Sequence, residues 1–212
     1  MPDIKLICFD LDKTLITQNS WYELNLALGI THEEDQQLFK DYSLGKFSYT
    51  EWTKKILKLF VRNKDANLVT ITKILSRYSF NGGAREIVKY LKSKGYHTAL
   101  ISGSVDILVD MVAKDLDIEL AQAVNTFVFD ESGRLKDILT LGDDEIAKLG
   151  ILESFCKKLG INIKECVCIG DGDNDIELFE KSGRGITFKG SKIEKAAWKV
   201  IDNLVDLKDV LA

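Results

Sequence analysis

The sequence predicts an α/β protein in which a parallel sheet is covered by helices on both faces. Two patterns lead to this prediction. Short apolar runs stop at acidic or glycine-containing segments, as strands do when they are buried on both faces of a sheet. From residue 84 onward, these runs alternate with segments whose apolar residues recur at helical spacing, which is the order typical of a parallel sheet.

The first strand is the apolar run over residues 5–9, which stops at Asp10. A helical region follows, because residues 21–28 are apolar without turn signals and apolar residues then recur at helical spacing. The recurring residues are Tyr49, Trp52, Ile56, Leu59 and Phe60, followed by Leu68, Ile71, Leu75 and Tyr78.

An Asn-Gly-Gly break at residues 81–83 separates this helical region from the alternating units. We therefore expect residues 18–79 to form an inserted helical domain within a core domain made of residues 1–17 and 80–212. The core elements expected after the break are a helix over 84–91, a strand over 97–101, a helix over 105–112, a hairpin over 126–135 with its turn at Ser132-Gly133, a helix over 149–159, and strands over 165–169 and 185–188.

Composition and charge exclude several classes of protein. The chain has 212 residues, of which 45% are hydrophobic and 29% charged, which excludes a disordered, collagen-like or disulfide-dependent chain. No apolar run approaches the roughly 18 residues of a membrane helix, and the N-terminus lacks the pattern of a signal peptide. The net charge of −4 disfavours a polyanion as partner. We expect a cytoplasmic protein without membrane or nucleic-acid partners, in which Cys166 and Cys168 are buried thiols of a strand.

Polar residues gather after three of the predicted strands, at the carboxyl ends where parallel sheets bind ligands. Two acids follow the first strand, a Ser-Gly-Ser segment follows the second, and residues 170–175 follow a later one. Lys148 opens the helix before that later strand. Any one of these residues alone is an ordinary turn former, helix cap or surface residue, so the prediction depends on their convergence. The converging residues are Asp10, Asp12, Ser102, Gly103, Lys148, Asp171, Asn174 and Asp175.

Such a cluster suits phosphoryl chemistry. Carboxylates held together repel one another, and Mg²⁺, which prefers oxygen ligands, relieves that repulsion. A carboxylate can also attack phosphorus and form an aspartyl-phosphate. Because Asp10 and Asp12 are two residues apart, one can attack while the other transfers a proton. Ser102 and Gly103, which we expect just before a helix, can neutralise phosphoryl oxygens with hydroxyl and N–H groups.

These residues make the sequence similar to the haloacid dehalogenase superfamily, and within it to the phosphoserine phosphatase-like branch. The segment from Asp10 to Leu15 resembles the first family motif, Asp-x-Asp-x-Thr, and residues 101–103 resemble the second. Lys148 is the candidate for the third motif, and residues 170–175 resemble the fourth. The resemblance covers essentially the whole chain, and the inserted helices resemble the family's cap domain. It implies a Rossmann-like parallel sheet and Mg²⁺-dependent hydrolysis of a small phosphomonoester.

The resemblance also implies a role for each residue. Asp10 would be the nucleophile, and Asp12 would be the general acid for the leaving alcohol and then the base for the attacking water. The metal group would be Asp10, Asp171, the backbone carbonyl of Asp12, and Asp175 nearby or behind waters. The phosphate-binding group would be Ser102, Gly103, Lys148 and Asn174.

Two positions depart from the phosphoserine phosphatases. Those enzymes carry a Glu shortly after the first motif, which holds the substrate ammonium, and an Arg in the cap, which holds its carboxylate. This sequence has Asn19 and Ile56 at those positions, so we expect phosphoserine not to be the best substrate. Tyr49 and Trp52 are either part of a more apolar substrate pocket or part of the core of the inserted helices.

Three alternatives to this hypothesis are open at this point. The first is a phosphoserine phosphatase proper, and the second is a phosphotransferase or mutase of the same superfamily. The third is a signalling phospho-acceptor similar to a response-regulator receiver, which also uses Asp, Mg²⁺, Ser or Thr, and Lys around a parallel sheet. The insert after the first strand and the loop at residues 170–175 argue against a receiver.

Overall fold

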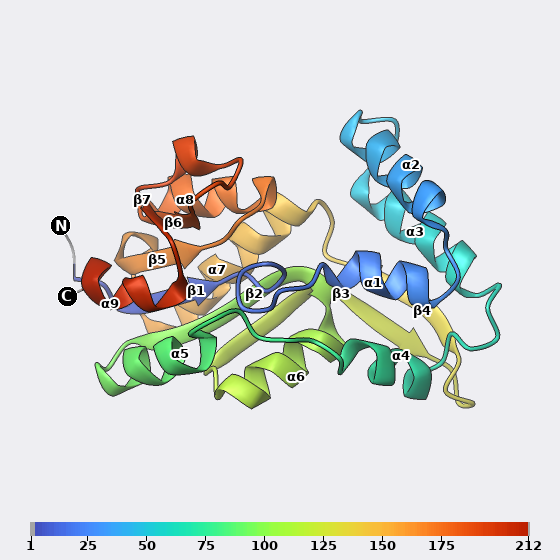
Figure 1. The fold of residues 1–212 in the computed structure, drawn as a ribbon, viewed down its shortest axis with the longest axis horizontal. Helices are drawn as coiled ribbons and strands as arrows, with labels where there is room; N and C mark the ends of the chain where they lie inside the picture. The colour runs from blue at the N-terminus through green and yellow to red at the C-terminus, as the bar shows by residue number, and fades with distance from the viewer. Residues whose placement is uncertain (1–2, 212) are drawn as a thin grey trace.

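Seven strands form a single sheet in the computed structural model, which describes residues 3–211 (Figure 1). Their order is β4-β3-β2-β1-β5-β6-β7, and neighbouring strands are parallel except for β3 and β4. The strands are β1 (Leu6–Phe9), β2 (His97–Val105), β3 (Leu120–Phe129), β4 (Leu135–Thr140), β5 (Cys166–Ile169), β6 (Gly185–Phe188) and β7 (Lys199–Ile201). The predicted α/β fold with a mainly parallel sheet is confirmed.

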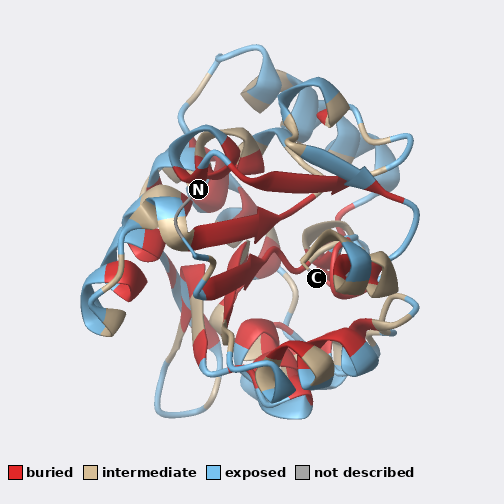
Figure 2. Ribbon diagram, turned by 90° about the vertical axis from the view of Figure 1, so that its left-hand side faces the viewer, coloured by how far each residue is buried: buried red, intermediate tan, exposed pale blue. Residues whose placement is uncertain are grey.

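The two central strands contain only apolar residues. Strand β1 reads Leu-Ile-Cys-Phe and β5 reads Cys-Val-Cys-Ile, and every residue of both is buried (Figure 2). Continuous apolar strands of this kind are stable because helices cover both of their faces. Cys8 lies opposite Cys168 in the register, and all four cysteines are free, buried thiols, as predicted for Cys166 and Cys168.

Two pairs of helices cover the sheet. Helices α5 (Ala84–Ser93) and α6 (Asp106–Leu116) contact each other on one face, together with the short α9 (Leu207–Val210). Helices α7 (Asp144–Leu159) and α8 (Ile176–Ser182) contact each other on the opposite face (Figure 1). Within residues 3–211, no helix has the length and apolar character needed to cross a membrane.

Four helices lie between β1 and α5 in the sequence, and we call them the α1–α4 block. They are α1 (Ser20–Ala27), α2 (His32–Ser43), α3 (Tyr49–Phe60) and α4 (Leu68–Leu75). The block packs against the β3–β4 hairpin, with α1 and α4 drawn on either side of its strands (Figure 1). Capping boxes start two of its helices, with Thr31 and Glu34 at α2 and Ser48 and Glu51 at α3. Each box satisfies N–H groups that would otherwise lack partners at a helix start.

The α1–α4 block is attached to the sheet at several points. The buried face of α3 consists of Tyr49, Trp52, Thr53, Ile56 and Phe60, and α3 contacts β4. At the start of α4, the Leu68 N–H donates to the Gly133 carbonyl at 2.8 Å, which ties the block to the β3–β4 turn.

Several elements differ from their predicted extents. The predicted hairpin is present, but β3 begins at Leu120 and also pairs in parallel with β2, so the first half of this strand and its place in the parallel sheet were not predicted. Strand β2 continues to Val105 through a bulge rather than ending at residue 101. Helix α2 and the three-residue strand β7 were not predicted. Both carry too little apolar periodicity to stand out, and α2 contains no buried residue.

Candidate active site

The carboxyl ends of β1, β2 and β5 lie side by side, because the three strands are adjacent and parallel. Phe9 pairs with Leu100 on one side and with Ile169 on the other. The Asp10 N–H continues this pairing by donating to the Ile169 carbonyl at 2.8 Å. The segments that follow the three strands therefore meet at one edge of the sheet.

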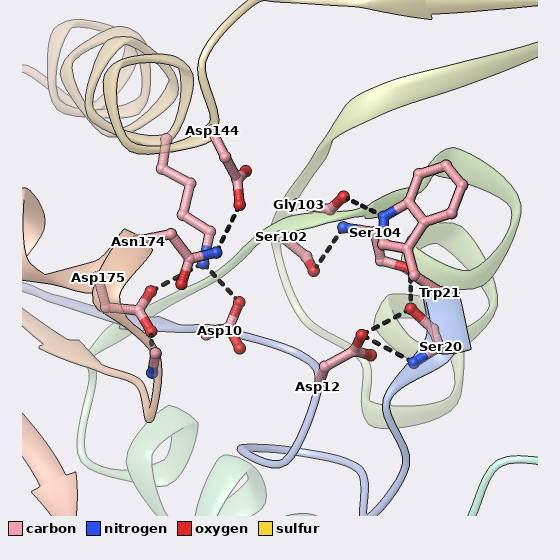
Figure 3. A network of polar contacts seen from close by, with 12 residues as sticks. Asp10, Asp12, Ser20, Trp21, Ser102, Gly103, Ser104, Asp144, Asn174 and Asp175 are labelled. Carbon is pink, nitrogen blue, oxygen red and sulfur yellow. Dashed lines mark hydrogen bonds and ion pairs between the residues drawn. The ribbon is translucent and has the colours of Figure 1, made fainter. Parts of the chain in front are cut away.

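The chain curls tightly after β1. The N–H groups of residues 14–16 all donate to the Leu11 carbonyl at 2.9 to 3.2 Å, and Lys13 takes a left-handed conformation with φ of 57°. Leu11 is fully buried in the core. The curl brings Asp10 and Asp12 to the same edge of the sheet, where both side chains face the site (Figure 3).

Lys148 joins two of the predicted site residues. Its Nζ lies 2.7 Å from Oδ1 of Asp10 and 2.8 Å from Oδ1 of Asp175, and the side chain is fully buried. Burial alone would lower the pKa of Lys148, but the carboxylates of Asp10, Asp175 and Asp144 raise it well above its usual value. Helix α7 begins at Asp144, so Lys148 lies one turn into the helix rather than at its start.

Three carboxylates form a group that could hold a metal ion. One oxygen each from Asp10, Asp171 and Asp175 lies within 4.8 Å of the other two. Burial raises the pKa of Asp10 and Asp171, and the neighbouring Asp175 raises both further. A divalent cation would relieve this repulsion, and the all-oxygen donor set fits Mg²⁺.

Asp12 accepts hydrogen bonds from the first residue of α1. Its Oδ2 accepts hydrogen bonds from the N–H of Ser20 at 2.8 Å and from the Ser20 hydroxyl at 2.7 Å. The Ser20 hydroxyl also lies 2.6 Å from that of Ser104 in β2. Burial raises the pKa of Asp12 to about 6, although the Ser20 hydrogen bonds oppose this. A carboxyl group with this pKa exchanges its proton near neutral pH, as a general acid–base group must.

Comparison with known proteins assigns the chain to a family. A model of the haloacid dehalogenase-like hydrolases matches residues 4–183. The chain belongs to the haloacid dehalogenase-like hydrolase family. It is 34% identical over 208 residues to a phosphoserine phosphatase from Methanocaldococcus jannaschii, covering 98% of this chain and 96% of that protein.

Two solved structures share the whole fold of this haloacid dehalogenase-like hydrolase. A phospho-aspartyl intermediate analogue of phosphoserine phosphatase has a TM-score of 0.84 and 31% identity, with 100% of both chains covered. A substrate-bound phosphoserine phosphatase complex has a TM-score of 0.81 and 31% identity, with 100% of this chain and 98% of the other covered. The predicted class of enzyme, a hydrolase of phosphoric monoesters, is confirmed.

In this haloacid dehalogenase-like hydrolase, residues 170–175 form a compact loop after β5. The Gly172 N–H donates to Oδ2 of Asp175 at 3.2 Å, while the other carboxylate oxygen accepts from Lys148. A methyl group on Gly170 would collide with the Asp175 carboxylate. Glycine is therefore required at position 170 for the Asp175 side chain to reach Lys148.

Asn174 has a partner that the sequence analysis missed. Its Nδ2 donates to Oδ2 of Asp144 at 2.5 Å (Figure 3). Asp144 is the first residue of α7 and lies four residues before Lys148, so the two side chains share one helix face. Burial raises the pKa of Asp144. The four-residue spacing between Asp144 and Lys148 is the one sequence signal that could have identified Asp144 as a site residue.

The carbonyl group of Gly103 accepts three hydrogen bonds. Nε1 of Trp21 donates at 2.8 Å, the Tyr49 hydroxyl at 3.2 Å and Nδ2 of Asn125 at 2.7 Å. Trp21 and Tyr49 belong to the α1–α4 block, so the block contacts the segment predicted to bind phosphate. Asn125, in β3, was missed because nothing in its neighbouring sequence marks it.

The segment that resembles the second family motif has a local structure different from the one predicted. Ser102 and Gly103 lie in the bulged end of β2, and α6 begins only at Asp106. The expected helix does follow them, but β2 continues through both residues to Val105, so they lie in a strand and not in the loop at the helix start. The Ser102 hydroxyl accepts from the Ser104 N–H at 3.0 Å, which fixes the bulge.

The residues predicted to set specificity occupy different environments. The buried Tyr49 ring stacks on Trp52 with ring centroids 5.5 Å apart, and its hydroxyl reaches Gly103. Asn19 is exposed and caps α1, since its Oδ1 accepts from the Tyr22 N–H at 3.0 Å. Ile56 is fully buried within α3.

Proposed function

We propose that the protein is a Mg²⁺-dependent phosphatase that hydrolyses small phosphomonoesters by way of a phosphorylated Asp10. The observation that carries this proposal is the arrangement around Asp10. One of its oxygens accepts from Lys148, and the carboxylate also belongs to the acidic group formed with Asp171 and Asp175. A nucleophile in this position has an ammonium group beside it and carboxylates that would hold a metal ion, and both cations would favour the approach of a phosphoryl dianion.

Asp10, Asp171 and the backbone carbonyl of Asp12 would hold the metal, with Asp175 next to them. When bound, Mg²⁺ supplies positive charge that offsets the carboxylates and the phosphoryl oxygens. Lys148 would contribute to the same neutralisation, because it is buried and its raised pKa keeps it charged. Ser102, Gly103 and Asn174 would bind the remaining phosphoryl oxygens through hydroxyl, N–H and amide groups.

Asp12 would transfer the proton in both steps. In the first, Asp10 attacks phosphorus, the ester P–O bond breaks, and the Asp12 carboxyl gives its proton to the departing alkoxide. In the second, the Asp12 carboxylate takes a proton from water as the water attacks the phosphorus of the aspartyl-phosphate, releasing phosphate and free Asp10. The pKa of about 6 suits Asp12 to both directions of transfer.

We further propose that residues 18–79 are a cap domain that closes over the site, with residues 1–17 and 80–212 as the core. The two connections run side by side, since the Thr17 N–H donates to the Ser79 carbonyl at 2.9 Å. Ser20 holds Asp12, so movement of the cap would directly change the environment of the acid–base group.

The similarity to phosphoserine phosphatases makes phosphoserine the first substrate to consider. The exposed Asn19 side chain caps α1 and the Ile56 side chain is buried and apolar, so neither supplies a charge for the head group of an amino acid. We therefore propose a small phosphomonoester other than phosphoserine as the preferred substrate.

The test is a screen of small phosphomonoesters with Mg²⁺ for release of inorganic phosphate. Trapping the intermediate by borohydride reduction and locating the modified residue by mass spectrometry would identify the nucleophile. Modification of Asp10 supports the proposal, and modification elsewhere or the absence of turnover contradicts it. A phosphotransferase or mutase would instead transfer the phosphoryl group to an added alcohol, and a receiver would keep it.

A further inference from the structure

Asp144 lies against the residues proposed to bind phosphate, yet it carries the same charge as phosphate. Its Oδ2 accepts from Asn174, and a methyl group built on Gly103 would collide with both of its carboxylate oxygens. The carboxylate therefore packs directly on the Gly103 backbone (Figure 3). The other oxygen, Oδ1, is shielded from solvent and has no hydrogen-bond partner. An unpartnered buried carboxylate oxygen is costly unless a ligand supplies the missing partner.

Aromatic side chains reach the same glycine from the α1–α4 block. Trp21 and Tyr49 both donate to the Gly103 carbonyl. Trp52 lies between them, with ring centroids 4.9 Å from Trp21 and 5.5 Å from Tyr49. Nε1 of Trp52 is buried without a partner. After burial itself, the Asp144 carboxylate is the largest influence that raises the pKa of Tyr49, consistent with its position near these rings.

The charge balance at this site favours a cation. Four carboxylates, those of Asp10, Asp144, Asp171 and Asp175, lie around one buried ammonium group, that of Lys148. The ammonium groups of Lys13 and Lys192 also act on Asp171, but both belong to exposed residues. In the part of the chain that the structure describes, the other buried cation is Arg184, which donates to the Lys164 carbonyl elsewhere in the fold. Even with one Mg²⁺ bound, these four carboxylates outnumber the positive charges of Lys148 and the ion before a phosphoester dianion arrives.

We propose that Asp144 binds a cationic group on the alcohol part of the substrate, so that the enzyme prefers phosphomonoesters of amino alcohols. This proposal rests on the phosphatase function proposed above. An ammonium group a few bonds from the phosphoryl group would pair with Oδ1 of Asp144, and the neighbouring aromatic rings would add cation–π attraction. Phosphoserine brings an additional carboxylate, for which the described residues of the site offer no further buried cation, so it fits less well than a simple amino alcohol ester.

The test compares two esters of equal size, 2-aminoethyl phosphate and n-propyl phosphate, which differ in an ammonium or a methyl group at the far end. We expect kcat/KM to be at least about tenfold higher for the amino ester, since hydrogen bonds to charged groups are among the stronger ones. In Asp144→Asn, which keeps the size and can still accept from Asn174, the ratio should fall towards one. Asp143→Asn removes the same charge from the exposed neighbouring residue and should keep the ratio.

Binding gives a second measurement that does not depend on turnover. Calorimetry with Mg²⁺ and the inactive Asp10→Asn protein should show the same preference for the amino ester, and Asp10→Asn/Asp144→Asn should lose it. The proposal would be overturned by a wild-type kcat/KM ratio of amino ester to propyl ester near one, or by a ratio that Asp144→Asn leaves unchanged. An increase in kcat/KM by the same factor for both esters in Asp144→Asn would also overturn it. Each of these results would leave the phosphatase function intact. Absence of hydrolysis of every phosphomonoester, with the binding preference present, would instead overturn the phosphatase function alone.

Discussion

Nζ of Lys148 lies 2.7 Å from Oδ1 of Asp10, although the two residues are 138 positions apart in the sequence. The same ammonium group reaches Asp175, so one buried cation holds two buried carboxylates in place. Removing the cation would leave both buried acids without their partner. We therefore expect the pair to be a structural requirement of the site as well as part of its proposed chemistry.

We expect Lys148→Met to lower the free energy of unfolding by about 3–5 kcal/mol, because it leaves uncompensated charge in the interior. The measurement is urea denaturation in EDTA, so that a metal ion does not replace the lost cation. Lys157→Met is the matched control, since Lys157 is an exposed residue of the same helix. A loss below about 1 kcal/mol would show that Asp10 and Asp175 do not depend on Lys148.

Asp10→Asn should reduce kcat by about a thousandfold or more while the fold is retained, because an amide has nearly the same shape but is a poor nucleophile. Phosphate release would be measured alongside circular dichroism and the unfolding midpoint. Asp173→Asn, at an exposed residue of the loop after β5, should stay within about threefold of wild type. Substantial turnover by a folded Asp10→Asn protein would rule out Asp10 as the nucleophile.

Treatment with EDTA should abolish activity, and added Mg²⁺ should restore it, while Ca²⁺ should be a poor substitute. The donor group is made of carboxylates, and Ca²⁺ prefers more ligands at longer distances, which would displace the nucleophile. Phosphate release would be followed while each metal is titrated into the stripped protein. Full activity of protein shown to be metal-free would contradict this prediction.

The pH dependence should differ between poor and good leaving groups. Because burial raises the pKa of Asp12 to about 6, its proton is present below that pH and is lost as the pH rises through it. For alkyl phosphates, kcat/KM should fall by up to about tenfold per pH unit above 6, since the alkoxide needs the proton. For p-nitrophenyl phosphate, whose leaving group needs no proton, this fall should be absent. Equal profiles for the two ester types would argue against Asp12 as the acid.

Phosphoserine should be at least about tenfold poorer in kcat/KM than the best small phosphomonoester without an amino-acid head group. The contacts that would hold its ammonium and carboxylate are missing at Asn19 and Ile56, and each charged hydrogen bond is worth about 1.5–3 kcal/mol. The comparison needs a panel of purified esters at equal Mg²⁺. If phosphoserine is the better substrate by tenfold, other residues of the α1–α4 block must bind its head group.

The sequence by itself determined the α/β fold class, the insertion after the first strand, and which residues lie at the carboxyl ends of the strands. These features follow from local patterns, because a buried strand must be apolar and its end is marked by the polar residues that follow. Asp10, Asp12 and the loop at residues 170–175 could be found in this way. The position of Lys148 near the start of a predicted helix brought it into the same group, but its role came only from the resemblance to a family.

Only the tertiary structure decided which side chains meet. Several hydrogen bonds join segments from different elements. They are the bond from Asn174 to Asp144, the three bonds to the Gly103 carbonyl, and the bonds from Ser20 to Asp12. Their distances depend on how helices pack on the sheet, which hydrophobic periodicity does not encode. Asp144 is the clearest case, because its sequence position predicts an ordinary acid in the first turn of a helix, whereas packing against Gly103 shields one of its carboxylate oxygens from solvent.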